Sequence, residues 1–250
     1  MPNDACRDAP DGKWNEQFSP TAEGFYVGTL TNVKALKEEP KMPPEDEVRS
    51  WVQLSYRSYS YNFNWGVFGS DVNRFYSIAI EPSKEIEQKA LELTNGASTN
   101  EEKVKRIYDF TRTQIRNITF DVMMTDEQKA KIEIKTATET LKRRMGHLGN
   151  INILFAALLK AVRINTALIL AGDRSENFFN PDRNVSESNI HPAGIVVFSS
   201  EGQAKLVNAG NPYLPYGKLF WFEEGSYAMI ASESSFQWKK LPAQSNPTYA

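Results

Sequence analysis

The segment RRMGHLGN (residues 143–150) runs directly into the apolar stretch INILFAALLKAV (residues 151–162). The longest apolar run in this stretch, residues 153–162, is interrupted by Lys160 and is about half as long as a membrane-spanning helix requires. It therefore predicts a buried helix of a folded domain, and membrane insertion is not expected. The polar segment before it predicts the helix start, where backbone N–H groups lack partners within the helix.

Helical signals also dominate the sequence before this stretch, from residue 83 onward. Thr99 and Glu102 form a capping box, in which the hydroxyl and the carboxylate each satisfy a backbone donor. The apolar residues that follow recur at helical spacing: Val104, Ile107, Tyr108, Ile115 and Ile118. Residues 126–134 and 138–144 predict shorter helices. The basic cluster at residues 142–144 is interpreted as a solvated face at a helix end.

The pattern changes from helical to extended after Arg163. Short apolar runs are separated there by Gly, Pro, Asn or Ser: residues 166–171, 194–198, 204–207, 219–222, 227–231 and 236–241. Such spacing predicts a mostly antiparallel sheet. Helices followed by strands predict an α+β fold, with the helices packed on the sheet, rather than a doubly wound parallel sheet.

The first 80 residues differ in composition from the rest. Residues 1–24 predict loop with one short pairing segment, residues 25–30 a strand, and residues 37–47 a stiff exposed connector that contains three prolines. From residue 51 to residue 80 the sequence is dense in aromatic and β-forming residues, and its first six residues alternate as a half-buried strand does. Such aromatic density suits either a carbohydrate platform or, as we favour, aromatic packing of a sheet against helices. We predict a β-rich N-terminal segment (residues 1–80) before the main unit (residues 81–250).

The overall composition is typical of a soluble globular protein. The chain has 250 residues, of which 40% are hydrophobic and 24% are charged, and this length can bury a sizeable core. The formal net charge of −2 gives no general attraction to nucleic acid or to acidic lipid. The amino terminus has no basic region followed by an apolar core, so no signal peptide is expected in this sequence.

Few residues are suited to metal binding or redox chemistry. Cys6 is the only cysteine, which excludes an internal disulfide and a cysteine-cluster metal site. The two histidines are His147 and His191, and they are far apart in the sequence. We therefore expect neither a metal ion nor a cofactor.

Several stretches in order along residues 83–241 resemble the core of bacterial transglutaminase-like proteins, which are papain-like cysteine enzymes. Residues 137–149 are similar to the family's helix, basic pair, glycine, acidic residue and reactive cysteine, with His147 at the acidic position, and residues 153–164 are similar to its Leu/Ala-rich helix. Residues 206–217 resemble its aspartate-bearing strand and the Pro/Gly loop after it. Residues 37–56 are similar to the end of a β-rich domain of unknown function that precedes this core in some bacterial members.

The resemblance implies the positions of a catalytic triad. Papain-like enzymes place the cysteine at a helix start, because the helix dipole and free N–H groups lower the thiol pKa and stabilise an oxyanion. A histidine from the sheet accepts the proton, and an Asp or Asn orients it. Carried over residue by residue, the nucleophile position holds Leu148, the base position His191 and the orienting position Asn208.

The two departures from this triad differ in weight. Asparagine can orient a catalytic imidazole, but a leucine side chain cannot attack a carbonyl, and loss of the nucleophile costs about 10⁶ in rate in subtilisin. The sequence thus predicts a pseudoenzyme with a degenerate triad, serving as a peptide- or glycan-binding or structural module of a bacterial protein. The alternative is a peptidase- or amidase-type hydrolase or acyltransferase without a cysteine, for instance one that activates water through His147 and His191. The resemblance also implies an extracytoplasmic location.

Overall fold

The computed structural model describes residues 13–14, 19–27, 30–31, 35, 37, 39, 64–176, 178–182, 187–198 and 204–243. The helices of the described chain are α2 (Trp65–Ala79), α3 (Lys84–Thr94), α4 (Asn100–Gln114), α5 (Asp126–Ala130), α6 (Ala137–Arg143) and α7 (Leu148–Ala161). A 3-10 turn, η1, covers Glu187–Asn189. Side-chain oxygens cap the starts of the helices before α7, supplied by Asn64, Ser83, Thr99, Thr125 and Thr136.

The main sheet has five strands in the order β11-β10-β7-β8-β9, and every neighbouring pair is antiparallel. The strands are β7 (Thr166–Gly172), β8 (Ile190–Phe198), β9 (Ala204–Val207), β10 (Tyr227–Ala231) and β11 (Phe236–Lys240). Two short strands, β5 (Arg116–Asn117) and β6 (Met145–Gly146), pair in parallel beside the start of α7. The predicted α+β class with an antiparallel sheet is therefore confirmed.

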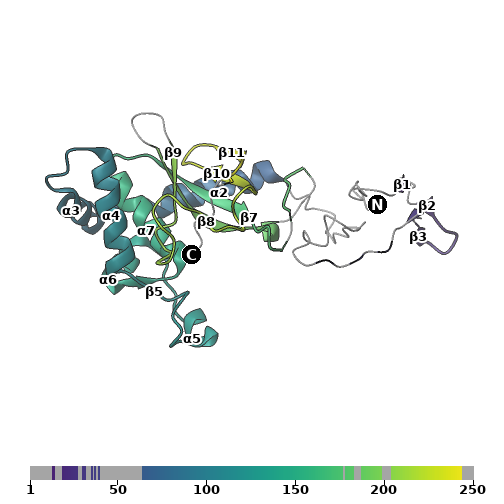
Figure 1. Cartoon of the computed structure of the whole chain (residues 1–250), viewed down its shortest axis with the longest axis horizontal. Helices are drawn as coiled ribbons and strands as arrows, with labels where there is room; N and C mark the ends of the chain where they lie inside the picture. The colour runs from purple at the N-terminus through teal and green to yellow at the C-terminus, as the bar shows by residue number, and fades with distance from the viewer. Residues whose placement is uncertain are drawn as a thin grey trace.

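The sheet separates two apolar layers. On one face, α3, α4, α6 and α7 gather at one end of the molecule (Figure 1) and share a core with Leu168, Leu170 and Ile195 of the sheet. The other face carries a smaller cluster that contains Ala167 and Ile169 and is covered by Leu219, from the segment between β9 and β10. We call these the helix face and the loop face.

Helix α7 is the central helix, as its apolar sequence predicts. Its contacts extend to α3, α4 and α6 on one side and to the sheet on the other. The side chains of Leu154, Phe155, Leu158 and Leu159 are fully buried. Within the described residues no helix is long and apolar enough to cross a bilayer.

Three predicted elements need correction. Residues 219–222, predicted as a strand, form part of a turn, because the Glu223 side chain accepts from the Phe220 N–H and backbone bonds close residues 220–224. The helix predicted over residues 126–134 ends at Ala130. Residues 65–79, predicted to be β-rich, form α2, whose Tyr76 is buried and donates to Thr166 Oγ1 at 2.7 Å.

The aromatic residues at the start of α2 do pack a helix against the sheet, as favoured from the sequence. Trp65 contacts the rings of Phe68, Phe179 and Trp238 edge to face, with centroids 5.0–5.7 Å apart. Because α2 also contacts β10 and β11, it packs with the main unit. The division of the chain at residues 80 and 81 stays a prediction.

The N-terminal region is described only in short pieces. Strands β1 (Lys13–Trp14) and β4 (Leu30–Thr31) form one antiparallel pair, and β2 (Ser19–Pro20) and β3 (Tyr26–Val27) form another. Of the strand predicted over residues 25–30, β3 and the first residue of β4 are described. Cys6, the strand predicted at residues 51–56 and most of the connector at residues 37–47 lie outside the described residues.

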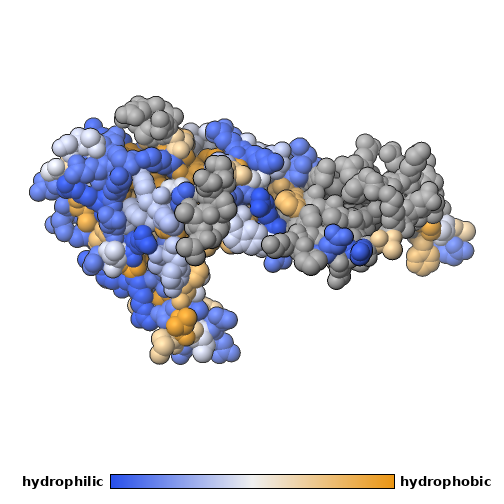
Figure 2. Space-filling view, in the orientation of Figure 1, coloured by the Kyte–Doolittle hydropathy of each residue, from blue (hydrophilic) through white to orange (hydrophobic). Residues whose placement is uncertain are grey.

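The surface in view is mainly hydrophilic over the helical end of the molecule (Figure 2). Apolar colour appears at the projecting lower tip, where Figure 1 draws α5. Val122 and Met123, which precede α5, are among the most exposed large apolar side chains described. The fold thus leaves an apolar projection close to β5.

Candidate functional site

The start of α7 is held by neighbouring polar groups. Leu148 is the first residue of the helix, and its backbone N–H donates to Thr119 Oγ1 at 3.0 Å. His147 precedes the helix with an extended backbone, and its N–H donates to Asn150 Oδ1 at 3.0 Å. The helix start therefore carries a partly buried hydrocarbon side chain at the expected nucleophile position, with its first N–H already engaged.

A buried network of carboxamides ties the next turn of α7 to the end of β9. Asn152 Nδ2 donates to Asn208 Oδ1 at 3.2 Å, and Asn208 Nδ2 donates to the carbonyl oxygen of Ala193 at 2.9 Å. Asn152 Oδ1 accepts from the Gly210 N–H at 3.0 Å. Both the amide nitrogen and the amide oxygen of the Asn208 side chain are therefore engaged in hydrogen bonds, and neither atom contacts His191.

Gly210 allows this close approach. Its backbone lies so near Leu148 that a Cβ at position 210 would collide with the Leu148 carbonyl group. Only glycine lacks that atom, so any other residue would push the loop away from the helix. The structure therefore brings two of the predicted triad positions, Leu148 and Asn208, into one neighbourhood.

His191 lies on the other face of the sheet. It is directly opposite Ala171 in the β7–β8 ladder, and directly opposite residues project to the same face. Ala171 belongs to the loop-face cluster, whereas α7 packs on the alternate residues Leu168 and Leu170. The expected triad is therefore not assembled, because the sheet separates the His191 imidazole from the start of α7.

On the loop face, His191 is paired with a carboxylate that the sequence did not single out. His191 Nε2 lies 3.2 Å from Glu223 Oε1, and the other carboxylate oxygen of Glu223 accepts from the Phe220 N–H at 3.1 Å. The Glu223 residue is 1% exposed, whereas the His191 side chain is 36% exposed. A buried carboxylate thus orients an imidazole that solvent can reach.

Glu223 left no recognisable signal in the sequence. It follows Phe220, Trp221 and Phe222 in a stretch that favours a strand, and it has no regular spacing from His191. The Phe222 ring lies 6.1 Å from the imidazole, centroid to centroid. Only the folded turn brings the carboxylate beneath His191.

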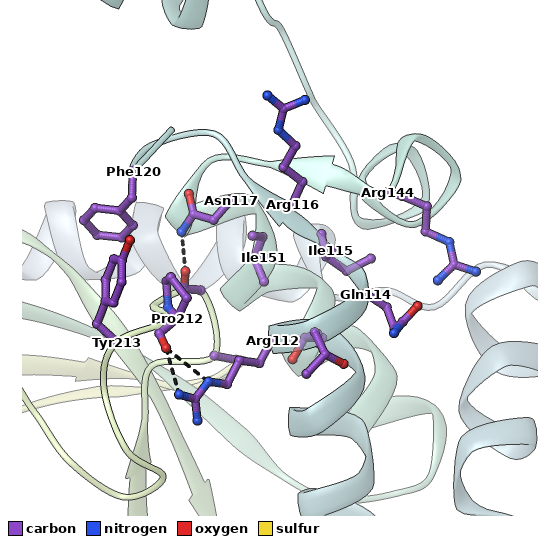
Figure 3. A pocket seen from close by; sticks show the side chains of 14 residues that line it. Arg112, Gln114, Ile115, Arg116, Asn117, Phe120, Arg144, Ile151, Pro212 and Tyr213 are labelled. Atoms are coloured by element: carbon purple, nitrogen blue, oxygen red, sulfur yellow. Dashed lines mark hydrogen bonds between the residues drawn. The ribbon is translucent and has the colours of Figure 1, made fainter. Parts of the chain in front are cut away.

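An open cavity of about 380 Å³ lies close to the start of α7. It is bounded by the end of α4, by β5 and by residues 209–213, and Ile151, within the first turn of α7, forms part of its wall. Figure 3 shows Ile115 and Ile151 at the centre, with arginines around them. Arg112 is turned toward Pro212, whereas the side chains of Arg116 and Arg144 point outward.

Charge and burial change the acid–base behaviour of two groups that contact arginines lining this cavity. A hydrogen bond from the Arg116 guanidinium, aided by the Met123 N–H, holds the pKa of Asp121 below its usual value. Burial raises the pKa of Tyr108, against the opposing effect of Arg112. The ion pair with Asp121 offsets the charge of Arg116, so the positive charge at the cavity comes from Arg112 and Arg144.

Metal ligands do not gather in the described part of the chain: no group of three or more His, Cys, Asp or Glu side chains there is placed to hold a metal ion.

Comparison with known proteins finds one family that matches part of the chain. Residues 87–200 match the model of the transglutaminase-like superfamily. These residues form a transglutaminase-like domain. Leu148 and His191 lie inside the matched range, and Asn208 lies just beyond it. No curated protein matches the chain.

Two solved structures are similar to this chain. A "putative protease" from Parabacteroides distasonis ATCC 8503 is 14% identical, with a TM-score of 0.49 over 70% of this chain and 31% of its own. A "putative cysteine protease" from Cytophaga hutchinsonii is 17% identical, with a TM-score of 0.40 over 72% of this chain and 59% of its own. The chain thus spans less than two thirds of either protein.

Proposed function

We propose that this transglutaminase-like domain performs no cysteine-type acyl transfer and acts as a binding module for a peptide or glycan ligand. The observation that carries the proposal is Leu148 at the first position of α7. Acyl transfer in this superfamily needs a thiolate at that position, and a hydrocarbon side chain has no electron pair with which to attack a carbonyl.

The other two triad positions support the same proposal. Asn208 is engaged by Asn152 and by the Ala193 carbonyl, and His191 projects from the loop face. Restoring one group would therefore leave the other two unable to serve it. A fold can keep its architecture after its chemistry is lost, so function has to be argued from what the site can still do.

Binding is supported by the cavity beside α7. Its volume of about 380 Å³ falls within the range of about 300–1,000 Å³ typical of ligand pockets. It combines buried apolar walls with charged groups at the rim, as ligand sites do. The same proposal includes a bacterial source and an extracytoplasmic location, both of which the family resemblance implies.

The test is an activity assay on the purified chain. Ammonia release from a glutamine-containing peptide, peptide cleavage and ester hydrolysis should all equal those of buffer. Detectable turnover that the His191→Ala variant loses would contradict the proposal, because it would show that the imidazole still serves a reactive group.

A second candidate function, hydrolysis without a cysteine, is favoured by the pairing of His191 with Glu223. In such a reaction the imidazole would take a proton from water while the buried carboxylate stabilises the imidazolium, as the aspartate does in a serine protease triad. Ester hydrolysis lowered in parallel by His191→Ala and Glu223→Gln, and unchanged by His147→Ala, would establish this candidate. If none of these variants changed the rate of ester hydrolysis, hydrolysis through His191 and Glu223 would be eliminated.

A further inference from the structure

We infer that the cavity beside α7 takes a carboxylate-bearing peptide, with the Arg112 guanidinium as the direct contact for the carboxylate. The inference rests on the proposed binding function and names its ligand class. It draws on three properties of the cavity: the charge of its rim, the fixed orientation of Arg112 and the small number of neutral polar groups left free in its wall.

The rim is positive on a chain whose formal net charge is −2. Arg112, Arg116 and Arg144 all line the cavity. Arg116 is neutralised by Asp121, with which it forms a close ion pair. Among the described residues neither Arg112 nor Arg144 has a carboxylate partner, and Arg144 lies over the Phe110 ring at 5.2 Å. Two positive charges therefore remain available to attract an anion.

Arg112 is held in one orientation. Its Nε and Nη2 atoms donate to the Pro212 carbonyl oxygen at 3.2 and 2.8 Å, and its guanidinium lies 6.0 Å from the Tyr108 ring centroid. These bonds fix the plane of the group and leave Nη1 outside them. A guanidinium that is already ordered loses less conformational entropy when it binds, and charge-assisted bonds to carboxylate are among the strongest in proteins.

Buried apolar groups form the inner wall. Ile115, Ile151 and Ala209 are buried, and Pro212 continues this surface toward the rim. A ligand that fills the cavity therefore needs an aliphatic part next to its charge. At the rim, the exposed Tyr213 ring packs edge to face on Phe120 and adds an aromatic border.

Several neutral polar groups of the wall already have partners. Thr111 Oγ1 donates within α4, Thr113 Oγ1 donates to the Asp109 carbonyl, and Asn117 Nδ2 donates to the Gly210 carbonyl. Asn117 Oδ1 accepts from the Thr119 N–H. A neutral sugar, which binds through many hydroxyl groups, would find few free partners here. An acidic side chain or peptide terminus next to an aliphatic residue fits better.

The experiment compares two fluorescein-labelled hexapeptides by fluorescence anisotropy. One alternates leucine and glutamate, and the other replaces each glutamate with glutamine at nearly the same shape. We expect the acidic peptide to bind at least about tenfold more tightly in low salt, because hydrogen bonds to charged groups are worth about 1.5–3 kcal/mol. The difference should shrink at high salt, since the rim is open to solvent.

Two substitutions locate the effect. Arg112→Gln should weaken binding of the acidic peptide about tenfold and leave the glutamine peptide unchanged. Arg144→Gln, which disturbs no contact with residues 209–213, should weaken it about twofold through the loss of longer-range attraction. The matched control is Arg74→Gln on α2, an exposed arginine that does not line the cavity.

The outcomes separate this inference from the proposed function. Equal affinity for the two peptides, or an affinity that neither cavity substitution changes, would overturn the carboxylate assignment. The proposed binding function would not be affected by that result. Binding of oligogalacturonate without binding of the acidic peptide would overturn the peptide assignment. Acyl-transfer activity in the wild-type chain would contradict the proposed function, even if the acidic peptide binds as expected.

Discussion

The two faces of the main sheet hold different kinds of buried polar group. On the helix face, Asn152 and Asn208 are neutral carboxamides that satisfy one another and the backbone around them. On the loop face, Glu223 is a buried carboxylate whose partner, His191, reaches solvent. The carboxamides of the helix face have all their partners inside the protein, whereas the loop face leaves the titratable imidazole of His191 accessible to solvent.

This difference indicates which face of the sheet carries a side chain capable of acid–base chemistry. A closed network rigidifies the contact between α7 and β9 but offers no proton to a ligand. An oriented imidazole at the surface can exchange protons with solvent, although no thiol or hydroxyl nucleophile faces it in the contacts described. The helix face therefore has Leu148 at the position where cysteine chemistry would need a thiol, whereas the loop face holds the solvent-accessible pair of His191 and Glu223.

Among the substitutions that compare the two faces, removal of the carboxamide network on the helix face should have the largest effect on stability. Asn152→Ala should lower the free energy of unfolding by about 3 kcal/mol, because it leaves Asn208 Oδ1 and the Gly210 N–H buried without partners, at about 1–3 kcal/mol each. Urea denaturation followed by circular dichroism measures the loss. The control is Gln88→Ala, an exposed position of α3, which should stay within about 0.5 kcal/mol of wild type. A loss no larger than that of the control would mean that the network is not closed as described.

The loop face should be less sensitive. Glu223→Ala leaves the Phe220 N–H without its carboxylate partner, but water can solvate the half-exposed imidazole of His191. We expect a loss of about 1–2 kcal/mol, smaller than that of Asn152→Ala, in the same denaturation experiment. Glu87→Ala on the exposed side of α3 is the control. If the Glu223 variant lost as much stability as the Asn152 variant, the buried polar groups of the two faces would contribute equally to the free energy of unfolding, and the contrast between the faces would fail.

Sequence reasoning succeeded where a periodic pattern extends over several turns or strands. The apolar run after Leu148 predicted the buried helix α7, and Thr99 predicted the start of α4, although the Glu102 carboxylate accepts from the Ser98 N–H rather than from that of Thr99 as a capping box requires. The spacing of short apolar runs after Arg163 predicted an antiparallel sheet. These features depend on local periodicity and end signals, which a single sequence contains.

The site was only partly predictable, because side-chain direction depends on register. Successive residues of a strand point to opposite faces, so correct order along the chain does not show whether His191 faces α7. An irregularity of the β7–β8 ladder next to Leu170 adds to this uncertainty. Glu223 and Asn152 became visible only through the tertiary contacts that give them partners. Residues 65–79 were mistaken for β structure because their aromatic residues favour strands, whereas the Asn64 cap and the burial of Tyr76 decide for a helix.

The most direct measurement is acyl transfer by a Leu148→Cys variant, made in a Cys6→Ser background so that it holds a single thiol. The assay follows ammonia release from a glutamine-containing peptide, and mass spectrometry detects any acyl-enzyme. Because His191 lies on the opposite face of the sheet, we expect no release above that of the Cys6→Ser parent and no acyl-enzyme. Turnover with an acyl-enzyme, both abolished by adding His191→Ala, would show that the imidazole does reach the start of α7 and would contradict the account.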